Sequence, residues 1–160
     1  MLQRIQSLQK NFGVSQGNCE DDVRNIEDSI DVKFPNDYRE FLLTYNGGVP
    51  EPSCFLISNH PEEILPIQLF FGIETSSISV SIIWNFKNYR DRVPDNLLPI
   101  GCSDFNDLIC LDLYENNYGH IVFWDLTGEC GKHNLNNVYE ICDSFSDFLS
   151  LLIDMPSEIG

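Results

Sequence analysis

The sequence predicts a single α+β domain in which helices near both ends of the chain accompany an antiparallel sheet. Apolar residues recur at helical spacing before Pro50 and again after Ser144, whereas short apolar runs separated by turn residues fill most of the chain between them. The 160 residues are 42% hydrophobic and 12% aromatic, which is enough to fill one substantial core. No repeat, low-complexity tract or linker divides the chain, so one domain over residues 1–160 is expected.

Three helices are expected in the first third of the chain. The first covers residues 1–12 and ends near Gly13. The second follows Asn18, which is expected to cap it, and its buried stripe is Val23, Ile26 and Ile30.

The third helix starts at the sequence Phe34 to Tyr38, because a proline is tolerated where its missing N–H has no partner. Its buried stripe is Tyr38, Phe41, Leu42 and Tyr45. Residues 46–48, Asn-Gly-Gly, accept the positive φ that a helix end commonly needs.

Five short apolar runs after Pro52 are predicted to be strands: residues 54–57, 68–71, 97–100, 108–113 and 120–124. The last two are expected to form an antiparallel hairpin through residues 114–119. Residues 79–89 place Ile82, Phe86 and Tyr89 on one helical face and are predicted to be helical. A closing helix is capped by Ser144, with Asp147 three residues later, and buries Phe145, Phe148, Leu149 and Leu152.

The charge is strongly negative, with 25 acidic and 9 basic residues and a net charge of −16. Residues 1–94 carry a net charge of −5, and residues 95–160 carry −11 with Lys132 as their sole base. Such a surface repels phosphate backbones and anionic lipids, so direct binding to nucleic acid or membranes is disfavoured, and a basic protein partner is favoured. Excess acid that merely keeps a protein soluble is the competing interpretation.

The six cysteines are widely spaced and mostly lie beside apolar residues, which predicts reduced thiols, most of them in the core, of a cytoplasmic protein. A disulfide framework is the less favoured alternative. The first residues lack the order of charged and then apolar residues that a signal peptide has, and no run approaches the ~20 apolar residues of a membrane span.

No motif with a catalytic mechanism occurs, because the three histidines lie in unlike contexts and no serine or cysteine lies in a known nucleophile signature. We therefore expect no catalytic residues and no enzyme activity. Cys130 and His133 form one close pair of zinc ligand types, but structural zinc sites usually have two such pairs, so an ordinary turn is favoured. The carboxylates of residues 104–112 lack the glycine and glutamate of a calcium loop, and Asn106 is expected to adopt left-handed backbone there. No metal site and no cofactor are predicted.

Three segments together resemble the SUKH superfamily, which includes the fungal Smi/Knr cell-wall regulators and many bacterial immunity proteins. The first segment is similar to the family's most specific pattern, and its matching residues are Pro35, Tyr38, Phe41, Leu42, Asn46, Gly47 and Gly48. The second runs from Leu98 to Asp112, and the third contains Trp124 within residues 119–125. The resemblance covers a core domain of about residues 18–153, with residues 1–17 as a helical addition.

The resemblance implies a central, mostly antiparallel sheet of about five to six strands flanked by helices. It also implies a non-enzymatic immunity protein, similar to an antitoxin, that binds a cognate protein toxin and blocks it. That toxin is often a nuclease, which is basic because it must hold phosphate. The alternative is an intracellular scaffold or regulator of the cell-wall type. A homodimer is compatible with either.

The residues expected to contact a basic toxin are acids of the second half of the chain: Asp104, Asp107, Glu115, Asp125 and Glu129. They are chosen from charge and from their expected places in loops. For any single one, a solvated turn carboxylate is the competing interpretation. The matching residues Asn46, Gly47, Gly48 and Trp124 are expected to serve the helix end and the core rather than a partner.

Overall fold

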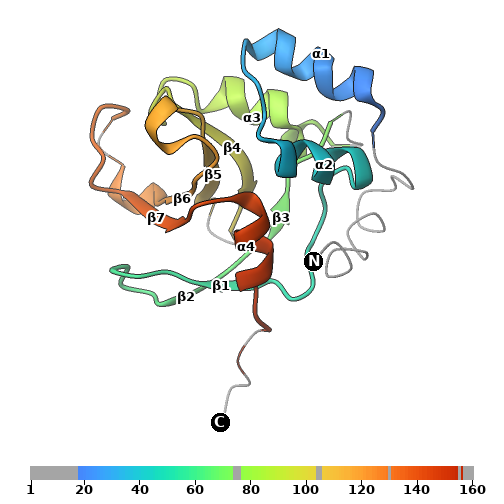
Figure 1. The fold of residues 1–160 in the computed structure, drawn as a ribbon. Coiled ribbons are helices and arrows are strands. Elements are labelled where there is room, and N and C mark those ends of the chain that lie inside the picture. The colour runs from blue at the N-terminus through green and yellow to red at the C-terminus, as the bar shows by residue number, and fades with distance from the viewer. Residues whose placement is uncertain (1–17, 74–76, 104–105, 130, 155, 157–160) are drawn as a thin grey trace.

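A five-stranded antiparallel sheet forms the centre of the structure, a computed structural model that describes residues 18–73, 77–103, 106–129, 131–154 and 156. The order across the sheet follows the order in the chain, and Figure 1 shows the sheet with its helices. Its strands are β3 (Leu69–Phe70), β4 (Leu97–Cys102), β5 (Leu108–Asp112), β6 (Ile121–Trp124) and β7 (Val138–Cys142). A separate two-stranded sheet pairs β1 (Cys54–Leu56) with β2 (Ile64–Pro66).

Helices cover both faces of this sheet, which confirms the predicted α+β class. They are α1 (Glu20–Ile30), α2 (Asn36–Thr44), α3 (Ile82–Asn88) and α4 (Phe145–Leu151), with 3-10 turns at Ile78–Val80, Glu115–Asn117 and Leu126–Gly128. Successive residues of a strand point to opposite faces, so Phe123 and Trp124 mark the two sides. Phe123 packs toward Phe55 of β1, which also meets Phe148 of α4, whereas Trp124 meets Tyr89 at the end of α3.

The helix predictions are largely confirmed, with one correction at the first described turn. Asn18 does not cap α1. Cys19 takes that place in a capping box with Asp22, and the Asn18 amide instead donates to the carbonyl of Leu42 and to Asn46. Helix α4 is capped by Ser144, which accepts from Asp147 N–H as predicted. The helix expected over residues 1–12 lies outside the described residues.

All five predicted strands are present, and the structure adds β2 and β7, which the sequence did not reveal. Strand β2 contains a proline and follows two glutamates, so its apolar run is too short to stand out. Strand β7 lies at the edge of the sheet, where each residue is only partly buried or exposed and the apolar alternation is weak. The hairpin of β5 and β6 is confirmed, with Leu108 opposite Trp124.

Most of the residues that carry the family pattern are buried, whereas Pro35 is partly exposed. Tyr38, Phe41 and Leu42 are fully buried, and Trp124 is 1% exposed. Asn46 closes the end of α2 onto the segment after β3: its Oδ1 accepts from Ile73 N–H at 2.6 Å and its Nδ2 donates to Ile73 C=O at 2.5 Å. Gly47 has a φ of 76°, and a Cβ there would lie 2.6 Å from the carbonyl oxygen of Phe70, so only glycine fits.

Within the described ranges, no helix is both long and apolar enough to cross a membrane.

Candidate functional site

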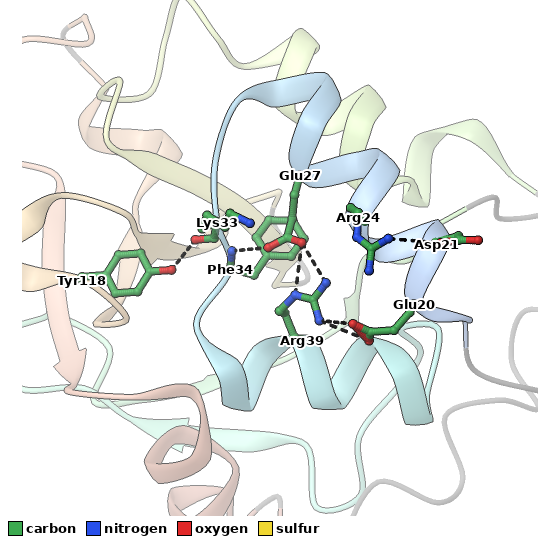
Figure 2. A network of polar contacts seen from close by, with 8 residues as sticks. All are labelled: Glu20, Asp21, Arg24, Glu27, Lys33, Phe34, Arg39 and Tyr118. Carbon is green, nitrogen blue, oxygen red and sulfur yellow. Dashed lines mark hydrogen bonds and ion pairs between the residues drawn. The ribbon is translucent and has the colours of Figure 1, made fainter.

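A buried ion pair joins α1 to α2 beside the loop that links β5 to β6. Figure 2 shows the Glu27 side chain reaching from α1 to Arg39 of α2. Glu27 Oε1 accepts from Arg39 Nε at 3.1 Å and from Nη2 at 2.9 Å, and its Oε2 accepts from Phe34 N–H at 2.8 Å. Arg39 also pairs with Glu20 at 2.7 Å. One guanidinium therefore links two carboxylates of α1 to the first turns of α2.

The Glu27 side chain is buried, with only 3% of it exposed, yet its carboxylate is ionised. Burial opposes ionisation, but the hydrogen bonds from Arg39 and from Phe34 outweigh it and hold the pKa of Glu27 below its usual value. Each nitrogen of the Arg39 guanidinium and both carboxylate oxygens of Glu27 thus have a hydrogen-bond partner, which is the condition under which a buried pair supports a fold.

The same network fixes the β5–β6 loop. The Tyr118 hydroxyl donates a hydrogen bond to the carbonyl of Lys33, which immediately precedes Phe34 (Figure 2). The next residue, Gly119, has a φ of 92° and approaches the Pro35 ring, and Asp37 accepts from Ser146 N–H of α4 at 2.9 Å. At this end of the sheet, these contacts therefore hold together the β5–β6 loop, the α1–α2 connection and the start of α4.

Exposed carboxylates gather at this end of the sheet. His120 lies between two of them, with Nδ1 3.5 Å from Glu140 and Nε2 3.9 Å from Asp143. Burial raises the pKa of the Cys142 thiol to about 12, and the negative charges of Asp147, Asp143 and Glu140 add to that rise. These three carboxylates therefore share one electrostatic environment.

Two exposed tyrosines belong to the same end of the sheet. Tyr114 and Tyr118 are 59% and 44% exposed, and they flank the exposed Glu115 in the β5–β6 loop. We name this region the acidic-aromatic surface, made of Tyr114, Glu115, Tyr118, Glu140, Asp143 and Asp147. Among the described residues, none of its four carboxylates forms an ion pair with a lysine or arginine.

Three of the acids selected from the sequence, Asp107, Asp125 and Glu129, lie at the opposite end of the sheet. Asp107 precedes β5 and Asp125 follows β6, whereas Glu115 follows β5. Four of the five acids expected to form one face are thus divided between two ends, and the fifth, Asp104, lies outside the described residues. Of the acids selected from the sequence, Glu115 is the one that is exposed and belongs to the acidic-aromatic surface.

Asp107 is 6% exposed and serves the interior of the protein. Its Oδ1 accepts from Leu126 N–H at 2.8 Å, and its Oδ2 lies 3.4 Å from the Ser103 hydroxyl. Burial raises the pKa of Asp107, and the nearby charge of Asp125 adds to the effect. This carboxylate is therefore not presented for contact with a partner.

Asp125 and Glu129 are also engaged by neighbours. Asp125 accepts from Thr127 N–H and lies 2.8 Å from His60 Nε2. Burial alone would raise the pKa of Asp125, but the hydrogen bonds from Thr127 and His60 outweigh burial, and the pKa of Asp125 is lowered. Glu129 receives two hydrogen bonds from Arg92, at 3.0 and 2.9 Å, which neutralise its charge.

A cavity of about 290 Å³ lies beside His60, Asp107 and Asp125. His60 is held by contacts to the rings of Phe123 and Tyr139, and its Nδ1 accepts from Glu62 N–H at 3.0 Å. With Nε2 facing Asp125, both ring nitrogens have partners. His60 thus ties the β1–β2 connection to the end of β6.

The described residues contain no group of three histidine, cysteine or acidic side chains placed to hold a metal ion. Cys130 lies outside them. Cys19, Cys110 and Cys142 carry free thiols, and burial raises the pKa of Cys110 well above its usual value.

Reasoning from the sequence did not select Tyr114, Tyr118, Glu140, Asp143 or Asp147. Glu140 lies on β7, which was not predicted. The other four could be grouped with it only from the register of β6 and β7, which brings the start of β6 beside the end of β7, with Ile121 opposite Cys142. One feature of the sequence did point to Glu140, Asp143 and Asp147: no lysine or arginine follows Lys132.

Comparison with known proteins identifies relatives and a family for this chain. The chain is 25% identical to the SPbeta prophage-derived uncharacterized protein YokK of Bacillus subtilis (strain 168), over 97% of this chain and 88% of that protein. It is 28% identical to the uncharacterized protein YnaB of the same organism, over 75% of this chain and 69% of that protein. Residues 20–149 match the SUKH_6 family model, described as SMI1-KNR4 cell-wall. This match covers most of the chain, and the protein therefore belongs to the SUKH_6 (SMI1-KNR4 cell-wall) family.

Proposed function

We propose that this protein is a cytoplasmic, non-enzymatic immunity protein that neutralises a cognate toxin domain by covering its active site. The toxin is a basic protein domain, of the nuclease type. The observation that carries the proposal is the acidic-aromatic surface, where two exposed tyrosines lie at the same end of the sheet as four exposed carboxylates, none of which pairs with a lysine or arginine of the described residues.

The chemistry of this surface suits a basic protein. Carboxylates that are not neutralised within their own chain attract a lysine- or arginine-rich partner and speed its association. Tyrosines are common anchors of protein interfaces because a rigid ring buries much area at low entropic cost. The ion pair of Glu27 and Arg39 and the hydrogen bond of Tyr118 hold this loop in place before a partner arrives, which reduces the cost of binding.

The proposal is tested with the gene immediately upstream. If that gene encodes a protein with a basic C-terminal domain, we expect the domain to be toxic when expressed alone and harmless when expressed with this chain. The two should co-purify, and their association rate should fall steeply between low and moderate salt. A domain that is harmless in cells lacking this chain contradicts the proposal.

Charge reversal locates the surface. We expect the triple change Glu140→Lys, Asp143→Lys and Asp147→Lys to weaken the complex by ~100-fold or more. The matched control reverses three exposed acids elsewhere, Glu51, Glu63 and Asp91, and produces the same net charge. Equal weakening by both triples would mean that overall charge, and not this surface, attracts the partner.

The family description favours a second candidate, an intracellular scaffold or regulator of the cell-wall type. This function requires binding to enzymes or peptides of wall synthesis without neutralising a toxin. Binding that is insensitive to salt, together with no protection against the upstream domain, would favour the regulator.

A further inference from the structure

Strand β7 forms one border of the five-stranded sheet. It pairs with β6 on one side, and no strand of the described residues pairs with its other side. In Figure 1 it lies at the margin of the sheet, beside the connection that leads into α4. An edge strand of this kind presents backbone N–H and C=O groups that another extended segment can pair with.

The register identifies which backbone groups face outward. Asp125 N–H donates to Asn137 C=O at 2.9 Å, so Asn137 directs its backbone groups toward β6. Phe123 lies opposite Tyr139 and Val122 opposite Glu140, and pairs of an antiparallel ladder alternate between bonded and non-bonded. Tyr139 therefore bonds toward β6, whereas the N–H and C=O of Glu140 point to the open side.

The surroundings of this edge indicate what it accepts. Leu135, just before β7, is 63% exposed, and the side chains of Glu140 and Asp143 are 62% and 86% exposed. No lysine or arginine follows Lys132 in the chain. Carboxylates on an edge repel the same acidic edge of a second copy, so they oppose self-pairing while they attract a segment with basic side chains.

We propose that the outer edge of β7 receives an extended, lysine- or arginine-bearing segment of the partner toxin as an additional strand. This inference rests on the proposed function and specifies its binding mode. Main-chain hydrogen bonds from Glu140 supply pairing, the carboxylates of Glu140 and Asp143 meet the basic side chains, and Leu135 offers an apolar contact at the end of the strand.

The test compares Glu140→Pro with Glu140→Gln. Proline removes the outward N–H and is tolerated on edge strands, whereas glutamine removes the charge alone and keeps the N–H. The probe is the basic C-terminal domain encoded upstream, and affinity is measured after circular dichroism shows that each variant is folded. We expect about threefold weaker binding for Glu140→Gln and roughly tenfold further weakening for Glu140→Pro, the effect of one or two lost hydrogen bonds.

Hydrogen exchange of the unmodified protein gives a second measurement that does not depend on the proline variant. The amide of Glu140 should exchange quickly in the free protein and slowly in the complex. If the domain binds the unmodified protein but Glu140→Pro binds as well as Glu140→Gln and the Glu140 amide gains no protection, the edge inference is overturned and the proposed function stands. If the domain does not bind the unmodified protein, both fall.

Discussion

The guanidinium of Arg39 donates two hydrogen bonds to a single carboxylate oxygen of Glu27, across the contact between α1 and α2. Glu27 is 3% exposed, whereas the Arg39 side chain is 20% exposed and also pairs with Glu20. Loss of Glu27 therefore leaves Arg39 one remaining partner and some access to water, but it leaves Phe34 N–H without its acceptor.

We expect Glu27→Gln to lower the free energy of unfolding by about 2 kcal/mol at pH 7, less than the full cost of breaking a buried pair because Arg39 retains Glu20. The pKa of Glu27 is lowered in the folded state, so its contribution is present above the unfolded pKa and is lost as the pH falls through the folded pKa. Urea unfolding of both proteins from pH 7 to pH 3 measures this. A difference that does not shrink below pH 4 would contradict an ionic role.

Asn46 is expected to be one of the most sensitive polar residues. Its amide pairs with both backbone groups of Ile73 and with Asn18, and it is 4% exposed. Asn46→Ala leaves these groups buried without partners, so we expect a loss of about 2–4 kcal/mol in the free energy of unfolding. Asn116→Ala, in an exposed turn, is the control and should change it by less than ~0.5 kcal/mol. Similar losses for both would contradict the interpretation.

Asp107 is expected to affect stability in the opposite sense to Glu27, because its ionised form destabilises the folded protein. Its folded pKa is raised, so ionisation costs stability and that cost appears as the pH rises from the unfolded pKa through the folded pKa. Asp107→Asn removes the charge and keeps an acceptor for Leu126 N–H. It should raise the free energy of unfolding by about 0.5–1 kcal/mol at pH 7, with a smaller gain near pH 4.

Asp107→Ala separates charge from hydrogen bonding, because it also removes the acceptor. We expect it to lower the free energy of unfolding by about 1–2 kcal/mol. A stabilising effect of alanine equal to that of asparagine would mean that the Leu126 hydrogen bond contributes little.

Substitutions of the two tyrosines of the acidic-aromatic surface should have different effects, one on partner binding and the other on stability. Tyr114 is 59% exposed, so Tyr114→Ala should leave the melting temperature nearly unchanged and weaken binding to the upstream basic domain by ~10-fold. Tyr118→Phe removes the hydrogen bond to Lys33 C=O and should cost about 1 kcal/mol of stability. Leu56→Ala, equally exposed on the β1–β2 sheet, is the matched control. Equal losses of affinity for Leu56→Ala and Tyr114→Ala would remove Tyr114 from the interface.

The fold was largely predictable because its signals are local. The helical stripes of Tyr38, Phe41 and Leu42 and of Phe145, Phe148 and Leu149 are fixed by side-chain spacing, and each became a buried face. The left-handed backbone of Asn106, at a φ of 64°, likewise follows from residue type. Strand β7 was missed because an edge strand buries too little to leave a regular apolar pattern.

The sequence by itself determined the α+β class, the core residues and the excess of negative charge in the second half, since composition and spacing set these directly. Only the tertiary structure decided which carboxylates remain available. Asp107 folds inward, Glu129 is neutralised by Arg92 from 37 residues away, and Glu140, Asp143 and Asp147 gather around Cys142. The physical reason is that ion pairing and burial depend on the pairing of distant strands, which places residues far apart in the chain within a few ångströms of each other.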